Sequence, residues 1–190
     1  MLSHLNDKSV FLASQSPRRK ELLQSLNITF QVRPTSVSES YPSTIPIREV
    51  AEFLARKKAH FFTIQNNEIY ITADTVVVSN QRILNKPKNE TEAEQMLLSL
   101  SNQSHTVYTG VCVQSKEKKI SFTEGTEVFF NPLTAKEIEH YIQQHHPFDK
   151  AGGYGIQDWI GRIGISKING CYYNVMGLPL SRLYSFLLKL

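Results

Sequence analysis

The first quarter of the chain places apolar runs on either side of an amphipathic stretch. Residues 10–13 are apolar and predict a buried strand, and residues 28–32 alternate between apolar and polar positions, which predicts another. Between them, Ser16 is placed to cap a helix, and Pro17 suits its first turn because proline lacks the N–H that would stay unbonded there. Residues 33–46 predict a loop, since they are rich in Ser, Thr and Pro.

The remaining hydrophobic pattern predicts helices and strands in alternation. Helices are expected from residue 46 to about 65, around 91–100, around 134–142 and from 179 onward. Strands are expected over residues 68–73, 105–113 and 160–168, and one or two further strands over residues 120–130. An apolar run at residues 76–78 follows the first of these strands. Thr91 with Glu94, and Thr134 with Glu137, have the spacing of a capping box, and the dipeptide at 169–170, Asn-Gly, predicts a hairpin. The alternation is compatible with an α/β fold and with a single domain over residues 1–190.

Composition and charge narrow the classes of partner. Of the 190 residues, 41% are apolar and 20% are charged, which is typical of a globular chain. The net charge of +4 mildly favours polyanionic ligands, but 17 acidic residues are interspersed, so we expect no nucleic-acid partner. The two cysteines lack metal-like spacing, which favours reduced thiols and a cytoplasmic location. Residues 1–9 lack the apolar core of a signal peptide and no run could span a membrane, so we expect no membrane partner.

Arg18 and Arg19 follow Pro17 in the first turn of the predicted helix. A strand that leads into a helix N-terminus presents unbonded N–H groups and the positive end of the helix dipole, and both favour anions. Two guanidiniums beside that point add bidentate phosphate binding. A solvated pair of arginines, a phosphorylation site or a nucleic-acid contact would give the same short motif, so other segments have to decide.

Asp74 interrupts an apolar stretch, at the end of the strand predicted over residues 68–73. A carboxylate is disfavoured in such a stretch, and its burial costs free energy unless a metal, a cation or hydrogen-bond donors compensate. Asp74 could simply cap a turn, but its place at a strand end favours a role in chemistry.

Six segments, taken in order, carry a resemblance to a known family. They are residues 12–23 (LASQSPRRKELL), 54–59 (LARKKA), 73–77 (ADTVV), 105–111 (HTVYTGV), 149–157 (DKAGGYGIQ) and 173–180 (YNVMGLPL). Together they resemble the Maf family of nucleotide pyrophosphatases, from residue 10 to about residue 188. The resemblance implies an ITPase-like α/β fold, with a bent mixed β-sheet flanked by helices and a cleft between two lobes. It also implies hydrolysis of a nucleoside triphosphate to the monophosphate and pyrophosphate.

The resemblance also assigns roles to single residues. The residues expected to bind the triphosphate are Arg18, Arg19, Lys58 and Lys86. Asp74 becomes the catalytic carboxylate, acting as the base toward water, as a metal ligand, or as both. Glu39 is expected to contact the metal with Asp74, or else a water molecule, although Ser38 replaces the first acid of the pair that the family usually has. The implied cofactor is a divalent cation, Mg²⁺ or Mn²⁺, held by carboxylate and phosphate oxygens.

Three positions indicate the nucleotide. Arg18, Thr75 and Gln157 resemble the group of the family that acts on dTTP and UTP, rather than the group that acts on 7-methyl-GTP. Uracil and thymine present an N3–H donor beside carbonyl acceptors, and the Gln157 amide offers the matching acceptor and donor. Gln157 could instead satisfy loop backbone, and Asp158, which follows it, stands where the family often has glycine. The family resemblance further suggests a homodimer.

Two other functions compete with the pyrophosphatase. One is a nucleotide-binding regulator of septum formation or cell division with little turnover, because family members are associated with septum formation. The other is a nucleic-acid-binding module based on the basic charge, against which the lack of interleaved aromatic and basic residues counts. Pyrophosphate release from a panel of nucleotides, with Mg²⁺ or Mn²⁺, is the measurement that narrows these alternatives most.

Overall fold

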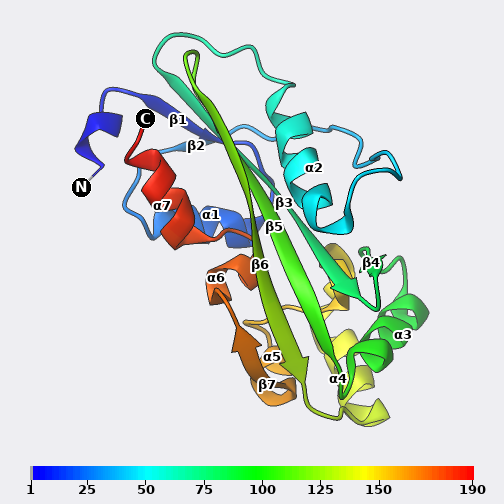
Figure 1. Cartoon of the computed structure of the whole chain (residues 1–190). Helices are drawn as coiled ribbons and strands as arrows, with labels where there is room; N and C mark the ends of the chain where they lie inside the picture. Colours follow the sequence, from blue (N-terminus) through cyan, green and yellow to red (C-terminus); the bar gives the residue numbers. More distant parts are fainter. Residues whose placement is uncertain (1) are drawn as a thin grey trace. The chain divides into compact units, whose positions relative to one another are not determined.

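The computed structural model describes residues 2–190, and the chain forms two compact units. The first unit comprises the described residues up to Asp74, Thr109–Glu124 and Gly177–Leu190, and the second comprises Thr75–Tyr108 and Gly125–Met176. Three long strands contribute a part of their length to each unit (Figure 1). They are β3 (Glu68–Ser79), β5 (Ser104–Gln114) and β6 (Lys119–Phe130).

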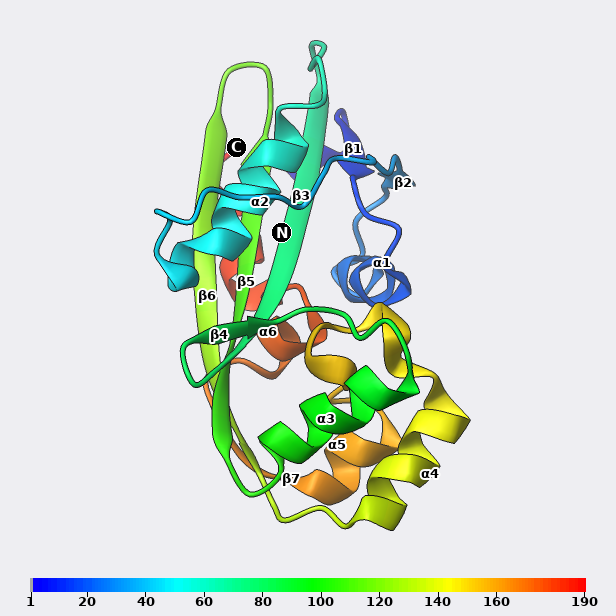
Figure 2. The same cartoon turned by 90° about the vertical axis from the view of Figure 1, so that its right-hand side faces the viewer.

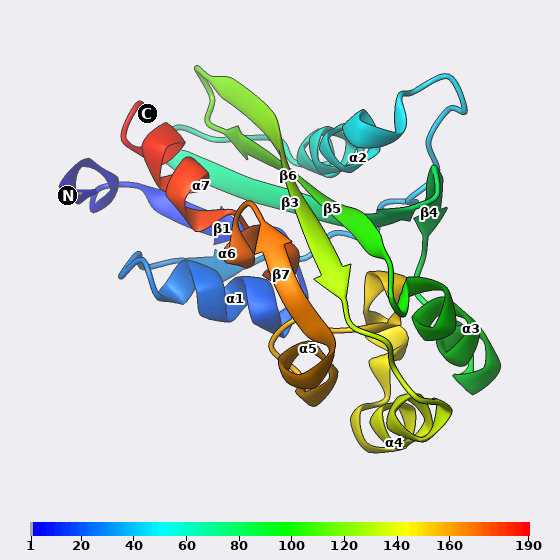
Figure 3. The same ribbon diagram turned by 60° about the horizontal axis from the view of Figure 1, so that its bottom comes forward.

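The strands belong to a mixed sheet in the order β2-β1-β3-β5-β6-β7, with β4 paired to β3. The shorter strands are β1 (Ser9–Leu12), β2 (Gln31–Val32), β4 (Arg82–Leu84) and β7 (Ile165–Asn169). In the first unit β1 is parallel to β2 and to β3. In the second unit β4 runs antiparallel to β3, and β7 runs antiparallel to β6, as the opposed arrows of β6 and β7 show (Figure 3). Helices flank the sheet, so the predicted α/β class with a mixed sheet is confirmed.

In the first unit, helices cover both faces of β6 because successive side chains of a strand point to opposite faces. The helices of this unit are α1 (Pro17–Gln24), α2 (Val50–Ala59) and α7 (Leu180–Leu187), of which α2 and α7 contact β6, and single 3₁₀ turns lie at Ser3–Leu5 and Ile47–Glu49. The hydroxyls of Ser121 and Thr123 donate to the carboxylate of Glu52 on α2 at 2.7 and 2.9 Å. Phe122, between them, stacks on Phe186 of α7 with ring centroids 4.7 Å apart. The alternation of β6 therefore anchors α2 on one face and α7 on the other.

In the second unit, helices pack around a core of buried aliphatic and aromatic side chains. They are α3 (Glu90–Leu100), α4 (Ala135–His145), α5 (Trp159–Gly164) and α6 (Tyr172–Met176), with 3₁₀ turns at Pro147–Asp149 and Ala151–Gly153. Figure 2 shows α3 and α4 side by side, and Leu97 and Leu100 of α3 share the core with Ile138 of α4. The predicted capping box of Thr134 and Glu137 is confirmed at the start of α4.

Several predicted boundaries were wrong. Asp74 does not end a strand, because β3 continues through it to Ser79. The second helix ends at Ala59 instead of near residue 65, and α3 is capped by Asn89, not by Thr91. Residues 160–164 are helical, and Asn169-Gly170 leads into α6 instead of closing a hairpin. No helix within residues 2–190 combines the length and the apolar character that a membrane span requires.

His105 of β5 is buried in the second unit. Its Nε2 lies 2.7 Å from the hydroxyl of Tyr154, and its ring is edge-on to that of Tyr154. Burial lowers the pKa of His105 to about 4, because the charged imidazolium is poorly solvated there. An unfolded chain therefore binds the proton at higher pH than the folded protein does.

This difference predicts loss of stability in mild acid. The neutral His105 contributes about 3 kcal/mol to the free energy of unfolding at a pH above the pKa that it has in the unfolded chain. This contribution disappears as the pH falls toward the pKa of His105 in the folded protein. By pH 5 roughly 2 kcal/mol of it should be lost. The free energy of unfolding is measured in urea at pH 7 and at pH 5. We expect its decrease between these two pH values to be roughly 2 kcal/mol smaller in His105→Gln than in the wild type. An equal pH dependence in both proteins would contradict the assignment.

Candidate functional site

Asp74 lies on the face of β3 that α2 covers. Two residues earlier on the same face, Thr72 donates its hydroxyl to the carbonyl of Ala55 on α2 at 2.7 Å. The period of two then places Asp74 beside Lys58, one helical turn further along α2, and the Lys58 ammonium donates to Asp74 Oδ1. Both side chains are largely buried, with 10% of Asp74 and 12% of Lys58 exposed. The ammonium therefore supplies the positive charge that a buried carboxylate requires.

The same ammonium also reaches Glu39 in the loop before α2. Lys58 Nζ lies 3.0 Å from Glu39 Oε1, and the Glu39 side chain is 54% exposed. Two carboxylates thus converge on one cation, from a strand and from a loop that are 35 residues apart in sequence. Sequence spacing alone gave no sign that Lys58 joins them.

Glu39 and Asp74 offer oxygen ligands of the kind that Mg²⁺ and Mn²⁺ prefer. Within residues 2–190 no three His, Cys, Asp or Glu side chains are grouped so that they could hold a metal ion. Two carboxylates nevertheless fit a magnesium site, because Mg²⁺ in nucleotide-binding sites is commonly held by one or two carboxylates together with substrate phosphates and water.

Arg19 is held by the backbone and by a buried serine. Ser16 caps α1 as predicted, and Arg19 Nε donates to the carbonyl of Gly177 at 2.9 Å. One terminal nitrogen of Arg19 donates to Ser14 Oγ at 3.4 Å. Burial lowers the pKa of Arg19 while the charge of Asp74 raises it, and a guanidinium in a protein stays charged. The neighbouring Arg18 is half-buried and adds a second guanidinium in the same helical turn.

The other predicted residues belong to the second unit. Thr75 follows Asp74 in β3 and is half-buried, and Lys86 is exposed in the segment after β4. The carbonyl of Asn85 accepts a hydrogen bond of 3.1 Å from the N–H of Gly152, which ties that segment to the loop before Gln157. The first unit therefore brings most of the predicted residues together, namely Arg18, Arg19, Glu39, Lys58 and Asp74. The other three predicted residues, Thr75, Lys86 and Gln157, belong to the second unit.

Gln157 occupies the third position of a turn. The N–H of Asp158 donates to the carbonyl of Gly155 at 3.1 Å and closes the turn. The side-chain oxygen of Gln157, Oε1, is buried and has no hydrogen-bond partner among residues 2–190. A buried amide oxygen without a donor is costly, so this position favours a ligand that brings an N–H or O–H group.

Some participating residues could not be predicted from sequence patterns. The carbonyl of Gly177, which holds Arg19 together with Ser14, lies 158 residues from Arg19 in the sequence, and such a contact has no periodic signal. Lys150 lies in the segment of residues 149–157 that resembles the family, but the sequence of that segment does not predict that the Lys150 ammonium lies near Asp158.

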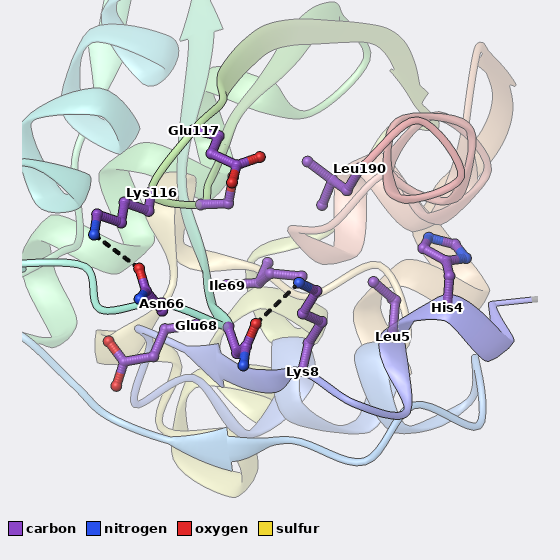
Figure 4. A pocket seen from close by; sticks show the side chains of 11 residues that line it. His4, Leu5, Lys8, Asn66, Glu68, Ile69, Lys116, Glu117 and Leu190 are labelled. Atoms are coloured by element: carbon purple, nitrogen blue, oxygen red, sulfur yellow. Dashed lines mark hydrogen bonds between the residues drawn. The ribbon is translucent and has the colours of Figure 1, made fainter.

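The first unit also contains a cavity of about 490 Å³ (Figure 4). Its lining includes Lys8 and Lys116, whose ammoniums donate to the side-chain carbonyls of Asn67 and Asn66 at 3.2 and 2.8 Å. Both lysines point their charge at neighbouring amides of the same wall. None of the predicted site residues lines this cavity, so it is not part of the cluster of Arg19, Glu39, Lys58 and Asp74 (the Asp74 cluster).

Comparison with known proteins decides the family. The family model described as Maf-like protein matches residues 9–190. The chain belongs to the Maf family. A relative from Parabacteroides distasonis, named dTTP/UTP pyrophosphatase, is 46% identical over 187 residues, which are 97% of this chain and 97% of the relative. A relative of the same name from Cytophaga hutchinsonii is 46% identical over 190 residues, covering 100% of this chain and 87% of the relative.

The fold of this Maf protein is also similar to that of a solved structure. A HAM1 protein from Coxiella burnetii aligns with 96% of this chain and 100% of its own, with a TM-score of 0.51 and 17% sequence identity. At that identity the likeness concerns the fold, and it agrees with the mixed α/β architecture of the two units.

Proposed function

We propose that this Maf protein hydrolyses dTTP and UTP to the nucleoside monophosphate and pyrophosphate. The observation that carries the proposal is the buried Asp74 carboxylate, which Lys58 joins to Glu39 close to Arg19. Relatives named dTTP/UTP pyrophosphatase, which match nearly the whole chain at 46% identity, support the substrate class. Arg18, which is half-buried next to Arg19 in the first turn of α1, adds to the positive charge that a triphosphate needs.

In the proposed reaction, water attacks the α-phosphorus. The bond from the α-phosphorus to the oxygen that bridges it to the β-phosphorus breaks, and pyrophosphate leaves with that oxygen. Asp74 orients the water and takes its proton, which requires the carboxylate to be held in place, as it is by Lys58. The cations proposed to hold the triphosphate are Arg18, Arg19, Lys58 and Lys86.

A divalent ion is part of the proposal. Glu39 and Asp74 would hold Mg²⁺ or Mn²⁺ together with phosphate oxygens of the substrate. When bound, the ion would neutralise phosphate charge and polarise the α-phosphorus. With the ion bound, the three N–H donors of Lys58 can still reach Glu39, Asp74 or a phosphate oxygen, so the ammonium keeps an acceptor.

Gln157 is proposed to read the base. Its buried Oε1 lacks a donor, and the N3–H of uracil or thymine is such a donor. Cytosine carries an acceptor at N3, so it would leave Oε1 without a hydrogen bond and would place two acceptors against each other. Thr75 and Arg18 are proposed to take part in the same discrimination.

Steady-state kinetics test this function. We expect kcat/KM for UTP and dTTP to exceed those for CTP and 7-methyl-GTP by about 10-fold or more, since each mispaired buried group costs about 1–3 kcal/mol. Pyrophosphate release is measured with Mg²⁺ and with Mn²⁺, and a reaction without divalent ion is the control. A preference for CTP or 7-methyl-GTP would overturn the substrate assignment. Nucleotide binding without pyrophosphate release would favour the regulator of septum formation or cell division instead.

The expectations of a homodimer, of a cytoplasmic location and of no nucleic-acid or membrane partner stay predictions. Molecular mass in solution tests the first of them directly.

A further inference from the structure

The turn that carries Gln157 is fastened to α4 through one tyrosine and one aspartate. The hydroxyl of Tyr141 donates to Asp158 Oδ2 at 2.8 Å, and the N–H of Gly155 donates to the same hydroxyl at 3.1 Å. The N–H of Asp158 closes the turn on the carbonyl of Gly155 at 3.1 Å. Both ends of the turn are therefore fixed to one phenol, and Gln157 lies between them.

The Asp158 carboxylate is packed closely in this network. Its side chain is 16% exposed, and its Oδ2 lies 3.7 Å from the ammonium of Lys150. A Cβ added to Gly155 would lie 2.6 Å from Asp158 Oδ2, so the carboxylate sits directly on the turn backbone. Burial and the negative charge of Asp158 raise the pKa of Tyr141, so the phenol stays protonated and keeps donating.

We propose that Asp158 is a positioning residue that sets base discrimination by holding the Gln157 amide in one orientation. The inference rests on the proposed role of Gln157 toward the base. Discrimination between a donor and an acceptor needs the reading atom to be held within a fraction of an ångström, whereas overall binding tolerates more freedom. Loosening the turn should therefore reduce selectivity and weaken binding of UTP, with little effect on the chemical step.

The test compares Asp158→Ala and Asp158→Asn with the wild type on UTP and CTP. In Asp158→Ala we expect the UTP/CTP ratio of kcat/KM to fall roughly 10-fold, through a higher KM for UTP and with kcat within about 2-fold. Asp158→Asn keeps an acceptor for the Tyr141 hydroxyl and should recover most of the ratio. Hydrogen exchange of the Gly155 amide reports the turn without any substrate, and it should accelerate in Asp158→Ala.

The same substitution made in a Gln157→Ala variant separates this inference from the proposed function. In Gln157→Ala the ratio should already be low, and adding Asp158→Ala should not lower it further. An unchanged ratio in Gln157→Ala alone would overturn the base-reading role and the inference with it. A lowered ratio in Gln157→Ala, with a wild-type ratio in folded Asp158→Ala, would overturn the inference only. An additional loss in the double variant, equal to that of Asp158→Ala alone, would mark Asp158 as merely structural and would also overturn it.

Discussion

Asp74→Asn should lower kcat by about 100-fold or more while the protein still folds, because loss of a general base or metal ligand commonly costs that much. Asn keeps the shape of Asp74 but loses its charge, its basicity and most of its affinity for a divalent ion. The buried ammonium of Lys58 keeps a carboxylate partner in Glu39 at 3.0 Å, so the fold should tolerate the change. The measurement is pyrophosphate release from UTP at saturating Mg²⁺, with the thermal midpoint as the check on folding.

Glu68→Gln is the matched control. Glu68 lies on the same strand, its side chain is 17% exposed, and it also pairs with a cation, Arg33, at 3.8 Å. This control loses a partly buried carboxylate of β3 outside the Asp74 cluster, and it should turn over like the wild type. Near-wild-type turnover in a folded Asp74→Asn variant would remove Asp74 from the mechanism.

A metal titration separates the two roles of Asp74. If Asp74 is mainly a ligand, Asp74→Asn should need much more Mg²⁺ for its residual activity, and Glu39→Gln should show the same change more weakly. If Asp74 is mainly the base, the Mg²⁺ requirement should change little while kcat falls. The two carboxylates differ in exposure, 10% against 54%, which is why the larger effect is expected at Asp74.

The local parts of the first unit could be predicted from the sequence, because they depend on neighbours along the chain. Ser16 and Pro17 start α1 as expected, since a cap and a first-turn proline act within four residues. The continuation of β3 through Asp74 could not be predicted. A carboxylate argues against a strand interior unless a cation compensates, and the compensating Lys58 comes from another element.

In the second unit, too, contacts between distant elements decide structure that the sequence pattern does not predict. Residues 160–168 are rich in isoleucine, which favours a strand, yet the first part folds as α5. The turn before α5 is fixed by the phenol of Tyr141, and the backbone N–H groups of Gly161 and Arg162 bond the carbonyl of Asp158 to start the helix. Tertiary contacts of this kind override propensity, and periodicity along the chain does not contain them.

The largest effect on stability is expected from Gly110→Ala. Gly110 lies in β5 directly beneath α2, and a Cβ there would lie 2.1 Å from the backbone nitrogen of Glu52 and 2.2 Å from the carbonyl carbon of Ala51. Backbone atoms cannot turn aside as a side chain can, and Glu52 also anchors α2 to β6 through Ser121 and Thr123. We expect a loss of roughly 4 kcal/mol or more, or no folded protein, measured by urea unfolding.

Gly125→Ala in β6 is the control for that substitution. A Cβ at Gly125 would meet Tyr108 Cε1 at 2.9 Å, and this is a side-chain atom that can move, so the cost should stay near 1 kcal/mol. Truncating Glu52 to alanine should not rescue Gly110→Ala, because the obstructing atoms belong to the backbone. Any Gly110→Ala protein that folds with α2 displaced should also lose turnover, since α2 carries Lys58 to Asp74. A wild-type urea midpoint for Gly110→Ala would show that α2 does not lie against β5 as described.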